Sequence, residues 1–190
     1  MTSFNDAYRG TPPWDIGRPQ AEFVRIARKG EIRGRVLDIG CGTGENAIFY
    51  AGLGLEVLGL DEAPLAIEKA RKKALERAAR VEFIVGDALH LKKLKRRFDT
   101  ITDCGLFHTF SDGDRKHFVK SLKAALSGTY FMLCFSDKEP TDWGGPRRVS
   151  KDEIRETFAG WKINYIREAR FSTTSDDEGG YAWLSSISSV

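Results

Sequence analysis

Residues 36–45, which read Val-Leu-Asp-Ile-Gly-Cys-Gly-Thr-Gly-Glu, constrain the fold more than any other segment of the chain. The segment begins as a continuous apolar run, as expected for a strand that is buried on both faces. It then passes through Gly40, Gly42 and Gly44 and continues into a helical pattern. Glycines are needed where the backbone turns tightly or approaches a ligand closely, and the N–H groups of a first helical turn then face that ligand. The segment therefore predicts a strand, a ligand-binding loop and a helix in succession.

Short apolar runs alternate with helical patterns along most of the chain, which is typical of a parallel sheet covered by helices. The runs that predict parallel strands are Arg35–Ile39, Glu56–Leu60, Val81–Val85, Thr100–Asp103 and Thr129–Phe135. Two further strand-like runs, Trp161–Ala169 and Tyr181–Ser188, are separated only by a polar loop. Because no crossover helix fits between these two, they predict an antiparallel hairpin at one edge of the sheet.

Helix boundaries are predicted from capping residues. Pro19 is placed to be the first residue of a helix. Asp112 or Asp114 can cap a later helix, which Gly128 is placed to end. Ser150 and Glu153 form the pattern of a capping box.

The spacing of the glycines discriminates between ligands. A dinucleotide fingerprint would place glycines at positions 40, 42 and 45, but position 45 is Glu. A carboxylate at that position would repel a pyrophosphate, which argues against a hydride-transfer enzyme that binds a dinucleotide. Asp38, just upstream, is a second acid that suits a cationic ligand.

The strand, the acid and the three spaced glycines resemble motif I of the class I methyltransferases that depend on S-adenosylmethionine (SAM). The resemblance implies a single Rossmann-like α/β domain over residues 1–190, with a mostly parallel seven-stranded sheet, the antiparallel C-terminal hairpin and helices on both faces. It also implies SAM as the cofactor, S-adenosylhomocysteine (SAH) as the product and no metal. Carried onto this sequence, the cofactor-binding residues of the family are Asp38, Gly40, Gly42 and Gly44 in the loop, Asp61 at the ribose, Asp87 and Ala88 at the adenine, and Asp103 and Cys104 at the methionine part.

An arm rich in proline and glycine precedes the first predicted helix. Its Pro-Trp-Asp-x-Gly-Arg pattern, residues 13–18, resembles the arm of small-molecule methyltransferases that act on thiols and halides, on thiopurines and on heterocyclic toxins. The resemblance implies that residues 1–18 cover the cofactor and that Trp14 contacts it. The alternative is that Trp14 only packs the arm onto the core. Cys104 stands where the plant thiol and halide enzymes carry an aromatic residue, which argues against halide as the acceptor.

The pocket for the methyl acceptor is predicted to include Tyr8, His108 and Trp143. The unperturbed pKa of histidine suits proton removal from a phenol, thiol or heterocyclic N–H, so His108 is a candidate general base. The alternative is a histidine that hydrogen-bonds the loop or faces solvent. Residues 137–149 follow a strand on the cofactor side of the sheet, where loops usually form the acceptor pocket.

The expected function is SAM-dependent methyl transfer to the S, O or N atom of a small thiol, phenol or heterocycle, by direct in-line displacement. Alternatives are a catalytically silent SAM-binding module and a methyltransferase acting on an oxyanion or on RNA. A nucleic-acid partner is disfavoured, because net charge is only +3 and the basic cluster Lys92, Lys93, Lys95, Arg96 and Arg97 lacks interleaved aromatic residues.

Three cysteines without metal-ligand spacing favour a reducing cytoplasm. No run of about 18 apolar residues predicts a membrane span. Nothing in the sequence indicates an oligomeric state.

Overall fold

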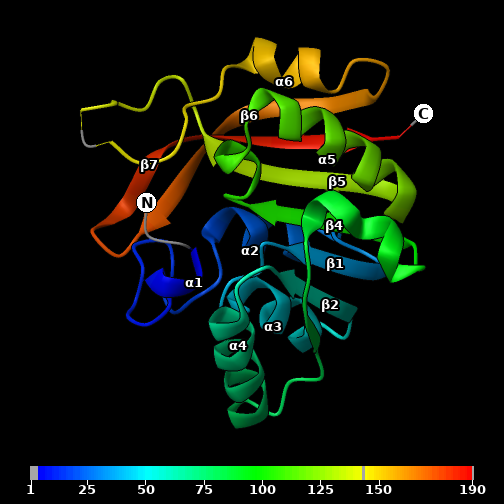
Figure 1. Cartoon of the computed structure of the whole chain (residues 1–190), viewed down its shortest axis with the longest axis vertical. Coiled ribbons are helices and arrows are strands. Elements are labelled where there is room, and N and C mark those ends of the chain that lie inside the picture. The colour runs from blue at the N-terminus through cyan, green and yellow to red at the C-terminus, as the bar shows by residue number, and fades with distance from the viewer. Residues whose placement is uncertain (1–3, 143, 190) are drawn as a thin grey trace.

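One seven-stranded sheet runs through the protein, as seen in a computed structural model that describes residues 4–142 and 144–189. The strand order is β3-β2-β1-β4-β5-β7-β6 (Figure 1). The strands span β1 Arg35–Ile39, β2 Glu56–Asp61, β3 Glu82–Val85, β4 Phe98–Cys104, β5 Leu126–Phe135, β6 Lys162–Thr173 and β7 Asp176–Ser188. The first five strands are parallel, and β7 pairs antiparallel with both β5 and β6. The predicted sheet, including its C-terminal hairpin, is confirmed.

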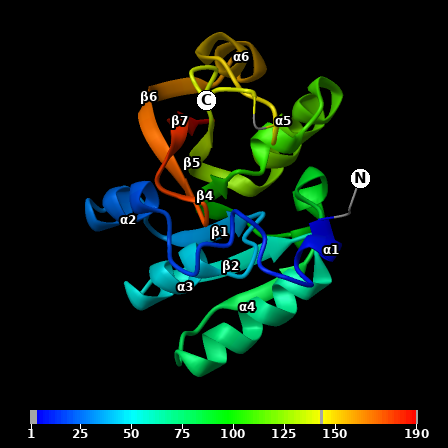
Figure 2. The same cartoon turned by 90° about the vertical axis from the view of Figure 1, so that its left-hand side faces the viewer.

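Helices cover both faces of the sheet (Figures 1 and 2). One face carries α2 (Ala21–Arg28), α3 (Glu45–Gly52) and α4 (Pro64–Glu76), and the other carries α5 (Asp112–Ala125), α6 (Lys151–Thr157) and the 3-10 helix η1 (Ala88–Leu94). Two short helices complete the described chain, α1 (Phe4–Ala7) and the 3-10 helix η2 (Phe107–Thr109).

Each face has its own apolar core, because successive strand residues point to opposite faces. In β1, Val36 packs with the helices α2, α3 and α4, whereas Leu37 packs with α5 and α6. Both side chains have no exposed surface. The continuous apolar run in the sequence is thus explained by a strand that helices cover on both faces.

Some predicted boundaries were wrong at the helix ends. The helix predicted from Pro19 begins at Ala21, and Gln20 is its N-cap. Ser111, not Asp112 or Asp114, caps α5, because its hydroxyl accepts a hydrogen bond from the amide of Asp114. The capping box of Ser150 and Glu153 is confirmed.

Two further predictions were wrong around β5 and the hairpin. Gly128 does not end α5 but lies inside β5, where an added Cβ would be 2.3 Å from the carbonyl oxygen of Asp99. The glycine is therefore required by a close backbone approach. The polar segment after Ala169, predicted to be a loop, is mostly strand. The pairing of β6 with β7 continues to Thr173 and Asp176, so only two residues form the turn.

The topology brings two loops together at the carboxyl ends of the parallel strands. Strand order reverses between β1 and β4, and ligands of such sheets bind where this reversal occurs. The glycine loop follows β1 and the turn into η2 follows β4, so both lie at this point. Within residues 4–142 and 144–189, no helix is long and apolar enough to cross a membrane.

Candidate active site

The glycine loop has the backbone that its glycines predict. Gly40, Gly42 and Gly44 have φ angles of +61°, +55° and +83°, a region that favours glycine. An added Cβ at Gly44 would lie 2.6 Å from the Phe83 ring, and one at Gly42 would lie 2.8 Å from the hydroxyl of Tyr8. The loop therefore needs glycine both for its φ angles and for the space beside it.

Asp61, at the end of β2, holds the loop in place. One carboxylate oxygen accepts a hydrogen bond from the amide of Gly42 at 2.8 Å, and the other accepts from the amide of Ala63 at 2.9 Å. Burial raises the pKa of Asp61, and these two amides oppose the rise. Since a carboxylate can accept about four hydrogen bonds, acceptor positions remain for ribose hydroxyls.

Asp38 is a buried acid behind the loop. One of its oxygens accepts a hydrogen bond from the Thr102 hydroxyl at 2.7 Å. The other is buried without a hydrogen-bond partner in the described part of the chain. Burial raises the pKa of Asp38 to about 7, although Thr102 and the amide of Ala47 oppose the rise. A cation near this carboxylate would favour its ionised form.

Glu45 does not act as the sequence suggested. Its carboxylate is directed to α4, where it lies 2.6 Å from Lys73 and 2.7 Å from Arg77. These contacts lower its pKa against the opposing effect of burial. The negative charge of Glu45 is therefore balanced by Lys73 and Arg77, so the argument that it repels a pyrophosphate is wrong. The remaining argument against a dinucleotide is that position 45 lacks the glycine of the dinucleotide fingerprint.

The N-terminal arm crosses the carboxyl ends of the strands, where Figure 2 shows it in front of β1. Tyr8 is buried, and its hydroxyl accepts a hydrogen bond from the indole N–H of Trp14 at 2.9 Å. Burial, together with the charge of Asp61, raises the pKa of Tyr8. Asp15 accepts a hydrogen bond from the hydroxyl of Thr43 in the glycine loop at 2.7 Å. The arm is thus attached to the loop itself.

The far end of the arm is attached to the C-terminal hairpin. The buried amide side chain of Gln20 donates to the carbonyl of Ser172 at 2.8 Å and accepts from its amide at 3.0 Å. The carbonyl of Pro13 accepts from the amide of Thr174 at 2.8 Å. Segments more than 150 residues apart therefore hold the arm across the site.

Beneath the arm lies a hollow of about 60 Å³. It is lined by the arm residues Tyr8, Trp14, Asp15, Ile16, Arg18 and Gln20, by residues 40–43 of the loop, and by Glu45, Asn46, Cys104 and Phe171. Ligand sites usually measure about 300–1,000 Å³, so this hollow is smaller than a typical ligand site. Asp38 and Asp61 lie behind the glycine loop and are not part of this lining. Their carboxylates suit the cation and the hydroxyl groups of SAM, and Gly40 and Gly42 let the backbone border the hollow.

Asp87 and Ala88 follow β3 at the same edge of the sheet. Asp87 is the N-cap of η1: one oxygen accepts from the amide of Leu89 at 2.7 Å, and the other lies 2.7 Å from a ring nitrogen of His90. Ala88 is buried. The Asp87 carboxylate therefore already caps η1. Its side chain is half exposed and remains accessible to a ligand.

The side chains of the neighbouring residues Asp103 and Cys104 point to different sides of the sheet. The Asp103 carboxylate is fully buried on the α5 side and accepts from the hydroxyl of Tyr130 at 2.7 Å and from the amide of Leu106 at 2.8 Å. Burial raises its pKa to about 6. The Asp103 side chain therefore lies away from the hollow, whereas Cys104 lines it. The family contact implied here is made by the backbone after β4, so the assignment of Asp103 to the cofactor stays a prediction. Burial raises the pKa of the Cys104 thiol.

His108 is buried and neutral. Its Nδ1 accepts a hydrogen bond from the amide of Phe135 at 3.1 Å, and its ring stacks on that of Phe135. Burial, with the charges of Arg115 and Arg148, lowers its pKa to about 3. Because Nδ1 is the acceptor, the proton of the neutral ring lies on Nε2. This arrangement suits a hydrogen-bond donor and argues against the predicted general base.

An aromatic wall lies next to the hollow. The rings of Phe135 and Phe171 are 4.8 Å apart, and those of His108 and Phe171 are 5.9 Å apart. Residues 137–149 connect β5 to α6, and the bridge between Ser136 and Val149 closes this loop. Trp143 lies outside the described residues. The described part of the chain holds no group of three or more acidic, Cys or His residues that could bind a metal.

Sequence reasoning missed Gln20, Asn46 and Phe171. The role of Gln20 becomes visible only through its hydrogen bond to Ser172, which lies 152 positions away in the chain. Asn46 accepts a hydrogen bond from the backbone amide of Gln20 at 3.0 Å, again a long-range contact. Phe171 fell in a segment interpreted as a polar loop, although its position two residues after Ala169 continues the alternation of a strand.

The fold is that of a Rossmann-like α/β protein with a glycine loop and buried acids at the carboxyl ends of its parallel strands. Comparison with known proteins identifies the family. The methyltransferase domain family matches residues 36–128.

The 2-heptyl-1-hydroxyquinolin-4(1H)-one methyltransferase of Mycobacteroides abscessus is 36% identical, over 93% of this chain and 85% of that protein. "Probable thiol methyltransferase 2" of Arabidopsis thaliana is 31% identical, over 78% of this chain and 67% of that protein.

A solved structure described as "Conversion of a Disulfide Bond into a Thioacetal Group during Echinomycin Biosynthesis" is 36% identical, with a TM-score of 0.89. It covers 100% of this chain and 93% of that one. The chain belongs to the methyltransferase family and is a SAM-dependent methyltransferase.

Proposed function

We propose that this enzyme methylates the S, O or N atom of a small thiol, phenol or heterocycle, by direct in-line displacement from SAM. The observation that carries the proposal is the arm. It crosses the site; its Asp15 is hydrogen-bonded to the glycine loop, and Gln20, which directly follows it, is hydrogen-bonded to β6. An acceptor must fit beneath this cover, which suits a small molecule better than a folded RNA or protein.

The comparisons support the same acceptor class. The relative from Mycobacteroides abscessus is named for a hydroxyquinolone and the one from Arabidopsis thaliana for a thiol. The similarity to the first extends over 93% of this chain. We therefore expect acceptors of comparable size, and we assign the enzyme to the cytoplasm because its three cysteines are free.

On the cofactor side, the proposed roles follow position. The ionised form of Asp38 would stabilise the ammonium group of SAM, while Gly40, Gly42 and Gly44 let the backbone approach it. Asp61 would accept from the ribose hydroxyls, and Asp87 and Ala88 would border the adenine. Cys104 contributes a small side chain beside the methionine part, and Trp14 covers it.

On the acceptor side, Tyr8, Phe171 and the loop 137–149 would surround the substrate. When bound, SAM supplies a methyl group activated by its positive sulfur. The protein must hold the acceptor in line and exclude water, and such positioning can contribute about 7–11 kcal/mol. His108 would donate its Nε2 proton in a hydrogen bond, so the acceptor loses its own proton to solvent or arrives as an anion.

Admission of ligands requires the arm to move. The hollow of about 60 Å³ is far smaller than usual ligand sites, and the hydroxyl of Tyr8 lies beside Gly42. We propose that residues 1–18 act as a lid that opens for SAM and the acceptor and then closes again. Opening would break the hydrogen bond between Asp15 and Thr43.

Methyl-labelled SAM tests the proposal directly. The enzyme is incubated with a small thiol, a thiopurine, a hydroxyquinoline, a simple phenol, iodide, tellurite and bulk tRNA, each in a separate reaction, and label is followed into each. Transfer to the thiol, the thiopurine, the hydroxyquinoline or the phenol is expected.

Other outcomes identify the alternatives. Label in tRNA or tellurite would overturn the acceptor class. SAM binding without transfer to any of these would support a catalytically silent module.

A further inference from the structure

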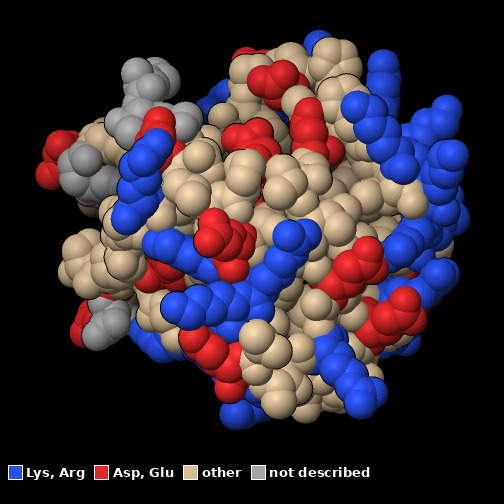
Figure 3. Space-filling view, turned by 60° about the horizontal axis from the view of Figure 1, so that its bottom comes forward, with Lys and Arg blue, Asp and Glu red and all other residues tan. Residues whose placement is uncertain are grey.

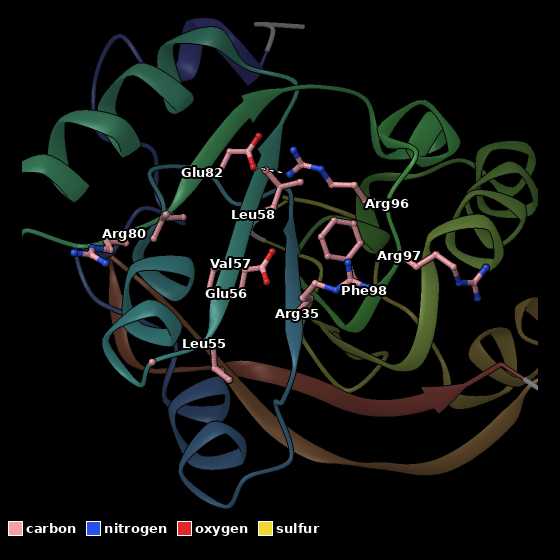
Figure 4. Close-up of a pocket in the computed structure, with 12 residues that line it drawn as sticks. Arg35, Leu55, Glu56, Val57, Leu58, Arg80, Glu82, Arg96, Arg97 and Phe98 are labelled. Atoms are coloured by element: carbon pink, nitrogen blue, oxygen red, sulfur yellow. Dashed lines mark hydrogen bonds and ion pairs between the residues drawn. The ribbon is translucent and has the colours of Figure 1, made fainter.

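A second hollow, of about 590 Å³, lies at the opposite end of the parallel strands (Figure 4). Its lining comes from the amino ends of β1, β2, β3 and β4 and from the residues just before them. It is far from the glycine loop, which follows the carboxyl end of β1. Its volume falls within the range of small-molecule sites, about 300–1,000 Å³.

The hollow has an apolar floor and a basic rim. Val57, Leu58 and Phe98 are buried side chains that form part of the floor. The charged residues of the rim are the four arginines Arg35, Arg80, Arg96 and Arg97 and the two glutamates Glu56 and Glu82. Figure 4 shows them around the strand starts, with the Arg96 guanidinium turned toward Glu82.

The positive charges on the rim are only partly balanced. Arg96 forms an ion pair with Glu82 at 2.6 Å. Arg97 donates to the carbonyl of Leu126 and to the hydroxyl of Ser127, neither of which is charged. Arg35 and Arg80 have no side-chain hydrogen bond or ion pair with any described residue. Glu56 is the register neighbour of Arg35 but forms no ion pair within 4 Å among the described residues.

The surroundings add charge of the same sign. Lys92, Lys93 and Lys95 precede the rim residues Arg96 and Arg97 and are exposed. Seen from below, Lys and Arg side chains gather along the right-hand edge of the molecule, the side on which the strands begin in Figure 1 (Figure 3). Clustered like charges repel one another, and a bound anion relieves that repulsion.

We propose that this amino-end hollow binds a small organic phosphate of nucleotide size. Guanidinium groups match phosphate oxygens with paired hydrogen bonds, and Arg35 and Arg80 have their donors available. The apolar floor suits a ring attached to that phosphate. The proposal is independent of the methyl acceptor, because the two hollows share no lining residue.

ADP without divalent metal is a suitable probe, measured by calorimetry in the presence of saturating SAH. Saturation matters because the adenosine part of ADP could otherwise enter the SAM site. Wild type is compared with the double variant Arg35→Gln/Arg80→Gln. The matched control is Lys116→Gln/Lys120→Gln on α5, which removes the same charge from exposed positions elsewhere.

The arginine variant is expected to bind ADP at least tenfold more weakly, and the lysine variant as wild type does. Glu82→Gln, which releases Arg96 from its ion pair, is expected to bind several times more tightly. Pyrophosphate should compete with ADP, and adenosine should not.

Three results would overturn the proposal. One is no ADP binding to the SAH-saturated enzyme, and another is equal weakening in both double variants. The third is a short RNA that binds more tightly than ADP with the same dependence on Arg35 and Arg80, which would indicate a nucleic-acid backbone instead of a small ligand.

Discussion

The two ends of the parallel strands are built from the same strands but differ in nearly every property. At the carboxyl ends, buried acids, positive-φ glycines and a covering arm surround a small hollow. At the amino ends, exposed arginines surround a hollow about ten times larger, without a cover. We therefore assign an enclosed cationic ligand to one end and, by the proposal above, an anion that exchanges with solvent to the other.

The difference teaches that the sheet alone does not determine what binds to it. Strands β1 to β4 contribute to both ends, yet the glycine loop and the arm exist only at one. Connections at the carboxyl ends form the enzyme site, as is general for open α/β sheets. The residues at the amino ends include exposed arginines and glutamates.

A glycine-to-alanine substitution at each end of the parallel strands should give the largest difference between the two ends. Gly42 and Gly54 both have positive φ, +55° and +84°, so alanine costs roughly 1–2 kcal/mol of stability at either. Only at Gly42 would the new Cβ meet a neighbour, the Tyr8 hydroxyl at 2.8 Å; at Gly54 nothing lies within 4 Å. Gly42→Ala should weaken SAM binding by at least about tenfold in calorimetry. Equal affinity in both variants would contradict the assignment of the glycine loop.

The arm provides the next largest contrast. Gln20→Ala removes both hydrogen bonds to Ser172 and leaves buried backbone groups unpaired, at about 1–3 kcal/mol per group. Arg35→Gln at the amino end is exposed and should change stability by less than about 0.5 kcal/mol. Urea unfolding measures both. The KM for SAM should rise only in Gln20→Ala; an unchanged KM would mean that the arm does not cover the cofactor.

Asp38 should give the carboxyl-end site a dependence on pH. Its pKa is about 7 in the native state and 3.8 ordinarily, so between these values the native state binds more protons than the unfolded state. Its contribution therefore makes the free energy of unfolding fall as pH rises from about 4 to about 7. Asp38→Asn lacks this titration, so its stability relative to wild type should increase over the same window. Urea midpoints at a series of pH values test this, and parallel curves would contradict it.

His108 should give the smallest effect. With its pKa lowered to about 3, it stays neutral across the working range and adds no inflection to kcat/KM near pH 6.5. His108→Asn should lower the rate through the lost Nε2–H donor and lost packing, and should leave the shape of the pH profile between 5.5 and 8 unchanged. An inflection in wild type that disappears in the variant would restore the general-base role.

Much of the fold could be predicted because its signals are local. The seven strands follow from apolar runs such as Arg35–Ile39, and the glycine loop follows from spacing within ten residues. Gly128 was misplaced because its reason, the carbonyl of Asp99, lies 29 positions away in the chain. The hairpin loop was predicted too long because polar strand residues there are paired by the backbone.

The site was predictable in position but not in direction. The directions of two acidic side chains beside the loops did not follow from sequence order: the carboxylate of Asp103 faces α5 and that of Glu45 faces α4. Which face a side chain takes depends on packing that no local pattern contains. The amino-end hollow combines the starts of four separate strands, and only Arg96 and Arg97 belonged to a cluster visible in the sequence.

Hydrogen–deuterium exchange of the enzyme with and without SAH tests the central claim most directly. The account predicts that SAH protects the amides of the glycine loop, residues 40–46, and of the arm, residues 8–20. Residues 54–58, 80–82 and 96–98 at the amino ends should exchange unchanged. Protection at the amino ends, with the loop and arm unaffected, would contradict the account.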